Sequence, residues 1–277
     1  MFARKLDKSG KVKLADVDTN ENSGMNRAEG EKRFAELAAE LFELQELMFA
    51  AGQNGLLVIL QGRDTSGKDG TLKAVAGAMN PAGVRIASFK VPTQEELSHD
   101  FLWRIHRETP GRGQVVFFNR SHYEDVLAVR VHNLVPEKVW RTRFNDINNF
   151  EKILTDADIL VAKFFLHISK DEQKKRLLAR EADPTKAWKL NPGDWAEREK
   201  WDEYTEAYEE ALSRCADPDA PWYIVPGDHK WFRNLAIAEA LVQTLRPHRK
   251  AWEDKLANVG AVQKKALDAM RAANKKA

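Results

Sequence analysis

Mostly apolar runs alternate along the chain with longer stretches in which apolar residues recur every three or four positions. The apolar runs cover residues 56–61, 84–89, 114–119, 159–168 and 222–225. Runs that do not alternate with polar residues are typical of strands buried on both faces, as in a parallel sheet. The pattern therefore predicts a parallel sheet of five strands.

The stretches between these runs have the spacing of amphipathic helices. They cover residues 68–79, 94–107, 121–131, 136–154, 170–181, 195–213 and 231–246. Another helical pattern precedes the first strand, where Phe34, Leu37 and Leu41 share one face and Gly52 ends the helix. Strands that alternate with helices predict an α/β fold with a doubly wound sheet and right-handed crossovers.

We expect one domain that spans residues 1–277. Its expected parts are an N-terminal arm (1–27), an N-terminal helix (28–52), a core (55–246) and a helical tail (247–277). The arm is polar and lacks periodicity, which predicts an extended or partly ordered segment. The lysine-rich tail has weak apolar spacing, which favours a solvated or partner-packing helix.

One stretch of the core, from Asp183 to Trp201, departs from the alternation of strands and helices. Two prolines and a glycine interrupt it, and lysines, arginines and tryptophans fill much of the rest. Its position between the fourth and fifth strands predicts a helical lid at about residues 180–205.

The composition is that of an ordinary globular protein, with 43% hydrophobic and 31% charged residues. No apolar run approaches the ~20 residues that cross a bilayer, and the first residues lack the apolar core of a secretory signal, so we expect a cytoplasmic protein without a membrane partner. The 44 basic and 42 acidic residues nearly cancel, which argues against a nucleic-acid partner. The single cysteine, Cys215, excludes a disulfide framework and a multi-cysteine metal site.

A glycine-rich loop follows the first strand directly. Residues 62–68 match the first seven positions of the phosphate-binding pattern GxxxxGK followed by Ser or Thr. Backbone N–H groups of such a loop converge on phosphate oxygens, and the next helix adds its positive end and a lysine, here Lys68. The predicted phosphate-binding residues of this segment are Gly62, Thr65, Ser66, Gly67, Lys68, Asp69 and Gly70.

Two acids make this loop unusual. Asp64 lies inside it, and Asp69 takes the position where Ser or Thr would offer a hydroxyl to Mg²⁺. Because an uncompensated carboxylate would repel phosphate, Asp64 indicates Mg²⁺, with Mn²⁺ as an alternative, between the acid and the phosphates. Asp69 could also hold the metal, but capping of the helix is the more common use of an acid at this position.

The third strand ends on Asn119, and Arg120, Glu124 and Asp125 follow it. In phosphate-transferring enzymes the end of such a strand holds the metal or orients the acceptor. The planar fork of Arg120 can bind the oxygens of a transferred phosphate in pairs. We therefore predict nucleotide binding by Arg120, Glu124 and Asp125, and metal binding by Asn119 and Glu124 together with Asp64.

Four segments together resemble the polyphosphate kinase 2 family: GRDTSGKDG, FKVPTQEELSHDFLWRIH, FFNRSHYEDVL and DPTKAWKLNPGDW. The resemblance covers about residues 30 to 245 and is far more specific than the glycine loop alone. It implies a P-loop kinase-like fold with a helical lid, and it implies Mg²⁺ as cofactor. It also implies inorganic polyphosphate as phosphoryl donor and nucleoside mono- or diphosphates as acceptors.

The resemblance assigns catalytic roles to Asp64, Lys68, Asn119 and Arg120, and donor binding to the lid cations. Many members of the family carry Asp at the position of Asn119. The FNRSHYEDVL form is similar to a subgroup associated with AMP as well as ADP. Both nucleotides therefore remain open as acceptors.

A polyanionic donor explains the placement of the cations better than a compact ATP molecule does. The predicted donor-binding cations are Lys68, Arg120, Arg176, Arg180, Lys186 and Lys189. A doubly wound fold would bring the glycine loop, the end of the third strand and the lid around one cleft. Each cation alone would more often be a solvated surface charge, so the prediction depends on their concentration beside two tryptophans.

Several other residues are expected to be structural. Phosphoryl transfer requires no histidine nucleophile, and the histidines lack the spacing of a zinc site. The residues placed in this group are His99, His106, His122, His132 and His167, a helix face of Leu97, Phe101, Leu102 and Ile105, the strand residues Trp222 and Tyr223, and Cys215.

The main hypothesis is a reversible polyphosphate-dependent nucleotide kinase that forms a homo-oligomer, a dimer or a tetramer. An ATP-dependent nucleoside or nucleotide kinase on the same fold is the alternative. A nucleotide-controlled switch is disfavoured, because the NKxD sequence of guanine recognition is absent and the only Asn-Lys pair is Asn274-Lys275.

Overall fold

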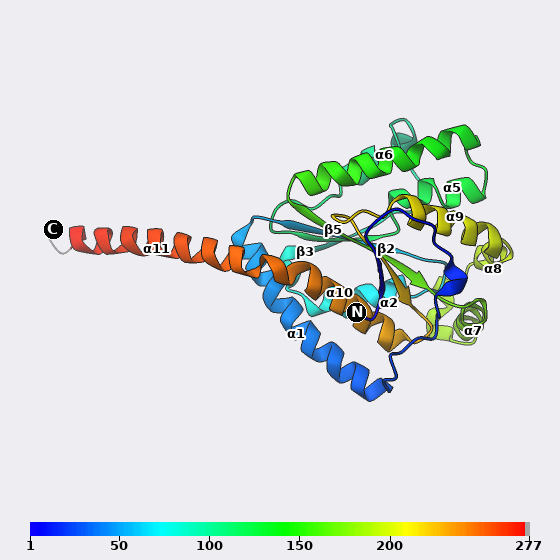
Figure 1. Ribbon diagram of the computed structural model, residues 1–277, viewed down its shortest axis with the longest axis horizontal. Coiled ribbons are helices and arrows are strands. Elements are labelled where there is room, and N and C mark those ends of the chain that lie inside the picture. The colour runs from blue at the N-terminus through cyan, green and yellow to red at the C-terminus, as the bar shows by residue number, and fades with distance from the viewer. Residues whose placement is uncertain (275–277) are drawn as a thin grey trace.

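The computed structural model describes residues 1–274. Helices cover both faces of a central sheet, and one long helix extends from the body of the molecule (Figure 1). This arrangement confirms the predicted α/β class.

The sheet has six strands in the order β1-β6-β5-β2-β4-β3. The strands are β1 (Arg4–Leu6), β2 (Gly55–Gln61), β3 (Val84–Ser88), β4 (Val115–Asn119), β5 (Ile159–His167) and β6 (Trp222–Pro226). The last five are parallel and correspond to the five predicted runs. The predicted count of five is wrong, because the N-terminal arm adds β1 antiparallel to β6. Its sequence, Arg-Lys-Leu, contains no apolar run that could have predicted a strand.

The central strand β2 lies between β4 and β5. From β2 the chain goes to β3 and β4 on one side, and it then crosses over to β5 and β6 on the other. Ligands of open α/β sheets bind outside the carboxyl ends of the strands where the order reverses in this way. In this register Leu60, near the end of β2, lies opposite Asn119 of β4 and Phe164 of β5.

Two hydrophobic cores lie on the two faces of the sheet. One core packs under α1 (Arg27–Ala51), α2 (Lys68–Val75), α10 (Lys230–Leu245) and the start of α11 (Arg249–Asn274). The other packs mainly under α6 (Glu137–Asp156), α9 (Trp201–Arg214), and the short helices α4 (Trp103–His106) and α5 (Ala128–Val131). Leu56, Val58 and Leu60 of β2 enter the first core, whereas Leu57 and Ile59 enter the second. The central strands are apolar because both of their faces are covered.

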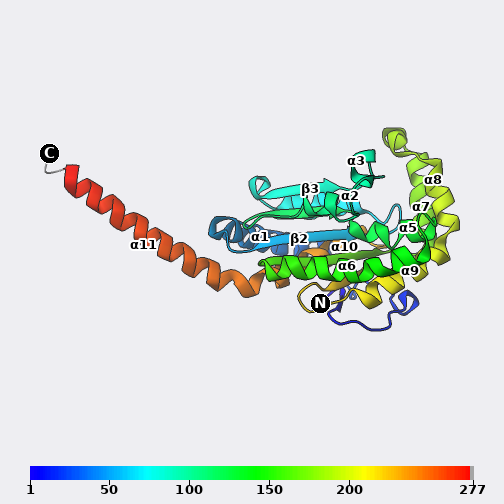
Figure 2. The same cartoon turned by 90° about the horizontal axis from the view of Figure 1, so that it is seen from above.

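The segment that was predicted to form a lid folds at the carboxyl end of the strands (Figure 2). It comprises the end of α7 (Lys170–Glu181), a 3₁₀ helix (Pro184–Lys189), α8 (Pro192–Glu199) and the start of α9. The side chains of Asp183 and Asn191 accept backbone N–H groups where the 3₁₀ helix and α8 begin. Pro184 and Pro192 stand at the first positions of these helices. A proline there has no N–H that would need a partner, and its fixed φ suits a helix, so both prolines start a helix rather than interrupt one.

The predicted helix over residues 94–107 is divided in the structure. The range 94–107 contains α3 (Gln94–Leu97) and α4, and Asp100 between them accepts the N–H of Leu102 across 2.9 Å. This bond between a side chain and the backbone competes with the backbone hydrogen bonds of a helix and interrupts the helix at this point. The prediction that Leu97 belongs to a core face is wrong, since the residue is exposed, whereas Ile105 is buried. The predicted packing of Trp222 and Tyr223 is confirmed.

The tail forms α11. Trp252 packs into the first core, but every residue of the helix from Ala257 to Asn274 is exposed. The helix leaves the domain in the direction opposite to α7 and α8 (Figures 1 and 2). None of the described helices combines the length and the hydropathy needed to cross a bilayer.

Candidate active site

The glycine loop, residues 62–67, joins β2 to α2 at the carboxyl edge of the sheet. Gly67 has φ +101° and begins α2 without a side-chain cap. A Cβ atom on Gly67 would lie only 1.9 Å from Nη1 of Arg233, so glycine is required for this approach. Thr65 also has a positive φ, +62°, which is uncommon for a residue with a side chain.

Lys68 is buried beneath this loop. Its ammonium group donates to the carbonyl oxygens of Gly62 (2.6 Å) and Arg63 (3.2 Å). Burial lowers the pKa of Lys68 to about 8; the nearby Arg120 lowers it further, and Asp64 opposes the shift. The loop thus fixes a desolvated cation whose attraction to an anion is stronger than that of a solvated lysine.

Arg120 follows β4 directly and has φ +63°. Its Nη2 donates to Oδ1 of Asp64 across 2.9 Å, and its Nη1 lies 3.5 Å from Oε2 of Glu124. The Glu124 carboxylate raises the pKa of Arg120 above its usual range, although burial opposes this effect. The guanidinium is therefore held between two acids, at a backbone position that is under strain.

Asp69 lies in the first turn of α2 and pairs with side chains from other elements. Its carboxylate accepts a hydrogen bond from Asn119 Nδ2 (3.2 Å) and another from Lys189 Nζ (2.7 Å). The bond from Lys189 holds the pKa of Asp69 below its usual value. Because α2 has no side-chain cap, the explanation of Asp69 as a helix cap is wrong.

The other lid cations are also engaged within the chain. Arg180 donates to Oδ2 of Asp194 across 2.6 Å, and Lys186 pairs with Asp183. Arg176 is almost fully buried and donates to four backbone carbonyls, those of Thr65, Ser66, Gly227 and Asp228. Arg176 therefore joins the glycine loop to the loop after β6, and this is a positioning contact.

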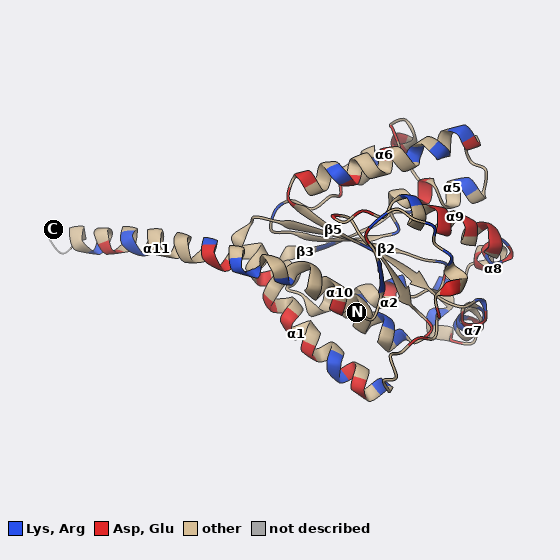
Figure 3. Ribbon diagram, in the orientation of Figure 1, with Lys and Arg blue, Asp and Glu red and all other residues tan. Residues whose placement is uncertain are grey.

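A basic cavity of about 460 Å³ opens between the glycine loop and the lid. Eight cations and two acids line it: Lys68, Arg120, Arg176, Arg180, Lys186, Lys189, Lys230 and Arg233, with Asp64 and Asp69. Helices α7 and α8 at this end of the molecule carry charges of both signs (Figure 3). The excess of cations in the cavity itself suits a polyanion.

A second, mixed cavity of about 400 Å³ lies on the other side of Asp64 and Arg120. Its lining includes the exposed apolar side chains of Val91 and Leu134, 90% and 67% accessible, and the ring of Tyr204. Asp64 and Arg120 line both cavities. Ligands in the two cavities would therefore approach each other at this ion pair.

The structure brings most of the predicted site residues together. Twelve line the basic cavity: Asp64, Thr65, Gly67, Lys68, Asp69, Gly70, Asn119, Arg120, Arg176, Arg180, Lys186 and Lys189. Gly62 and Glu124 line the mixed cavity. Ser66 is fully buried, and Asp125 lies outside both cavities with its carboxylate 2.8 Å from Nη1 of Arg143. Asp125 is thus not placed with the other residues predicted to bind the nucleotide.

Sequence reasoning missed Arg63, Lys230 and Arg233. Arg233 is 2% exposed, and its Nη1 donates to the carbonyl of Ser66 (3.2 Å). Burial lowers its pKa to about 9, and no carboxylate of the described residues forms an ion pair with it. Arg63 stacks on Trp201, with its guanidinium carbon 3.8 Å from the centre of the ring. The signal for Arg233 was an arginine among the apolar residues in the first turn of the helical range 231–246.

Oxygen atoms that could hold a divalent cation lie where the two cavities meet. Asp64, Asn119 and Glu124 supply them, but the described residues contain no compact group of three His, Cys, Asp or Glu side chains suited to a metal. Mg²⁺ is commonly held by one or two carboxylates together with substrate phosphates and water. The residues present fit a metal that shares its coordination with a phosphate chain.

A family model described as polyphosphate kinase 2 matches residues 24–253. An AMP/ADP-polyphosphate phosphotransferase from Meiothermus ruber is 47% identical over 87% of this chain and 91% of its own. An ADP-polyphosphate phosphotransferase from Rhodopseudomonas palustris is 40% identical over 77% of this chain and 78% of its own. The crystal structure of a polyphosphate kinase 2 from Arthrobacter aurescens TC1 superimposes with a TM-score of 0.84 at 44% identity, covering 87% of this chain and 88% of that one.

Proposed function

Because the chain belongs to the polyphosphate kinase 2 family, we propose that it transfers the terminal phosphate of inorganic polyphosphate to AMP and ADP, and that the transfer is reversible. The observation that supports this proposal most strongly is that two neighbouring cavities share Asp64 and Arg120 in their linings. One cavity has the charge for a polyanion, and the other has the mixed surface that a nucleotide requires.

The basic cavity is the proposed donor site. The glycine loop with Lys68 would act as the P-loop and hold the terminal phosphates, while Lys186 and Lys189 of the lid would contact phosphates further along the chain. Each bound phosphate would replace an internal acid as the partner of a lysine. The buried charge of Arg233, which has no carboxylate partner among the described residues, supports an anion as the missing partner.

The mixed cavity is the proposed acceptor site. Val91 and Leu134 present exposed apolar surface on which a purine base could be buried, at a distance from the charged end. The nucleotide phosphate would then point to Arg120. Support for both AMP and ADP comes from the names of the relatives, one of which is an AMP/ADP-polyphosphate phosphotransferase.

In the forward reaction an oxygen of the nucleotide phosphate attacks the terminal phosphorus of polyphosphate. One P–O bond forms, the bond to the remaining chain breaks, and a polyphosphate one unit shorter leaves. Lys68 and Arg120 would stabilise the negative charge of the transferred group by electrostatic contact. Asp64, Asn119 and Glu124 would hold Mg²⁺, which supplies charge neutralisation and alignment of the phosphates when bound.

We further propose that the protein acts in the cytoplasm, as a homo-oligomer. The decisive assay supplies AMP and polyphosphate with Mg²⁺ and no ATP, and it follows ADP and ATP by chromatography. Formation of ADP, and then of ATP, is the expected result. Folded Lys68→Ala is the control and should be inactive. Product formation only when ATP is added would show that the protein is an ATP-dependent kinase and would overturn the proposal.

A further inference from the structure

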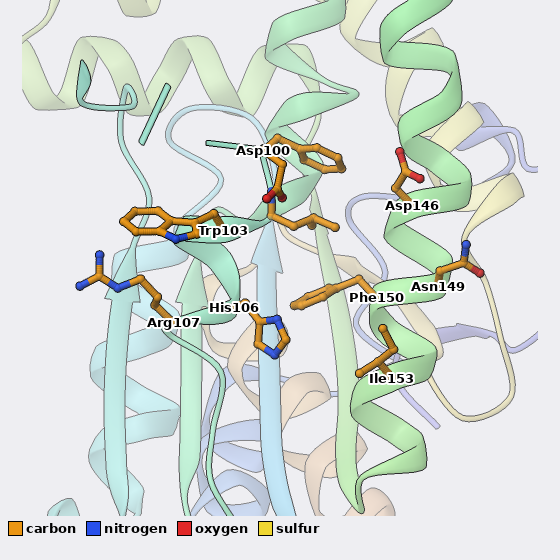
Figure 4. A pocket seen from close by; sticks show the side chains of 10 residues that line it. Asp100, Trp103, His106, Arg107, Asp146, Asn149, Phe150 and Ile153 are labelled. Atoms are coloured by element: carbon orange, nitrogen blue, oxygen red, sulfur yellow. The ribbon is translucent and has the colours of Figure 1, made fainter. Parts of the chain in front are cut away.

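A groove of about 840 Å³ lies between α4 and α6 (Figure 4). It shares no lining residue with the basic or the mixed cavity. The rings of Phe101 and Phe150 and the side chain of Leu102 contribute its apolar surface. An apolar hollow of this size that is open to solvent indicates a binding surface.

The two sides of the groove differ in chemistry. Trp103 lies on one side, with the guanidinium of Arg107 4.7 Å from its ring centre. On the opposite side α6 presents Asp146 and Ile153, and Ile153 is 57% exposed (Figure 4). Among the described residues neither Asp146 nor Asp100, the other acid of the groove, has an ion-pair partner. The groove therefore suits a ligand with an apolar face and flanking cations.

The exposed part of α11 has these properties. Its large apolar residues are Val259, Val262, Leu267 and Met270, which are 46% to 66% exposed. At 100° per residue they fall within one side of the helix. The charged residues Lys264, Lys265, Asp268 and Arg271 fall on the other side and carry a net positive charge. This is the pattern of an amphipathic helix that lacks its partner.

The partner surface is not on the same domain. The buried Trp252 anchors α11 to the face of the sheet that carries α1, whereas the α4–α6 groove lies on the opposite face. From this anchor α11 runs away from the domain as a continuous helix (Figures 1 and 2). A helical segment of this length is only marginally stable alone in water, so its apolar side gains stability from burial on another molecule.

We propose that the exposed part of α11 of one copy binds in the α4–α6 groove of a second copy. Val262 and Leu267 would pack on Phe101, Phe150 and Ile153, as in other complexes in which a helix fills an apolar groove. Lys264 and Arg271 flank this apolar side and would meet the unpaired carboxylates of Asp100 and Asp146. Exchange of α11 in both directions gives a dimer with two-fold symmetry.

The apolar side of α11 is long enough to cover the groove. The eleven residue steps from Val259 to Met270 span about 16 Å along the helix axis. The groove extends along α6 from Asp146 to Ile153, which is about 11 Å. The family match ends at residue 253, so the exposed part of α11 lies beyond the matched region. The proposed interface is independent of the proposed phosphate transfer, because neither the groove nor the exposed part of α11 lines the basic or the mixed cavity.

The first test measures the mass of the full chain in solution by light scattering, without substrates. The wild type should form dimers, or tetramers built from them. Ile153→Asp in the groove and Leu267→Asp on α11 should each raise the dissociation constant at least tenfold. Val139→Asp is the matched control, because Val139 is an exposed apolar residue of α6 outside the groove. A monomeric wild type, or dissociation by Val139→Asp alone, would overturn the proposal.

The second test is a charge exchange between the two surfaces. Asp146→Lys and Lys264→Glu should each weaken association, and the combination of both should restore it at least in part. If removal of residues 259–277 dissociates the dimer but Asp146→Lys and Ile153→Asp do not, α11 pairs elsewhere and the groove is not its site. Phosphate transfer by Leu267→Asp measures the catalytic proposal separately, since Leu267 lies outside both site cavities.

Discussion

The carboxylate of Asp69 and the ammonium group of Lys189 lie 2.7 Å apart and join the first turn of α2 to the lid. Asp69 occupies the position at which the glycine-loop pattern has Ser or Thr. This ion pair lies in the lining of the basic cavity and occupies a cation that the proposed donor needs. Polyphosphate and Asp69 would therefore compete for Lys189.

Lys189→Gln should raise the KM for polyphosphate about tenfold and leave the KM for AMP within twofold. It should also reduce the salt dependence of donor binding, because one fewer cation is screened. The stability should change by less than about 1 kcal/mol, since Asp69 is exposed and Lys189 is only partly buried. Initial rates at several salt concentrations check this, with Lys175→Gln on the exposed side of α7 as control. A selective loss of AMP affinity would place the acceptor under the lid.

The pH dependence of donor binding should report Lys68. The pKa of this lysine lies at about 8 in the folded protein without ligand, below its ordinary value of 10.5. Lys68 therefore loses its charge as the pH rises through about 8, and kcat/KM for polyphosphate should fall above that pH. The effect of Lys68 on the stability of the fold has the opposite sign. Between pH 8 and 10.5 Lys68 is protonated in the unfolded chain but largely neutral in the folded protein, so the free energy of unfolding rises with pH in this range. A kcat/KM that stays constant from pH 7 to 10 would contradict this assignment.

Arg233→Met should separate donor binding from stability. The variant removes a buried cation from the basic cavity, so the KM for polyphosphate should rise about tenfold. The lost hydrogen bond to the Ser66 carbonyl should cost only about 1 kcal/mol. Denaturant unfolding and donor titration measure the two effects. A stable variant with unchanged donor kinetics would remove Arg233 from the site.

Glu151→Gln should destabilise the fold by about 3–5 kcal/mol, because it leaves the fully buried Lys163 without its charged partner. Glu151 also accepts the hydroxyl of Tyr123 across 2.8 Å, next to the turn that carries Glu124. Urea unfolding measures the loss, and Glu137→Gln on the exposed side of the same helix should cost less than about 1 kcal/mol. Equal stability of the two variants would contradict a structural role for the pair.

The same pair has a pH signature. Burial alone would raise the pKa of Glu151, but Lys163 and His122 lower it overall. A carboxyl group with a lowered pKa stabilises the fold above its ordinary value of 4.5, and this stabilisation is lost as the pH falls below it.

The sequence predicted those elements whose burial leaves a periodic pattern. The strands β2, β4, β5 and β6 are apolar because helices cover both of their faces, and that condition is visible in the residues themselves. The strand β1 could not be predicted, because an edge strand of three residues is held by backbone pairing that leaves no trace in Arg-Lys-Leu. The division between α8 and α9 at Lys200 likewise follows from the local backbone and not from a Gly or Pro.

The clustering of the glycine loop and its cations around one cavity was predictable, because a phosphate site requires those residue types close together. Their internal partners were not predictable. Asp125 and Glu124 are neighbours in sequence, yet the 3₁₀ turn directs one to Arg143 and the other to Arg120. Arg233 lies on a helix far along the chain, and only the fold brings it to Ser66.

The position of Asp64 and Arg120 on the border of two cavities has a consequence for the course of the reaction. Donor and acceptor would face each other across charged groups and not across a nucleophilic side chain. Phosphate that passes directly between them undergoes one displacement, which inverts the configuration at phosphorus. It also requires a ternary complex, so double-reciprocal plots intersect and neither substrate alone leaves phosphate on the protein.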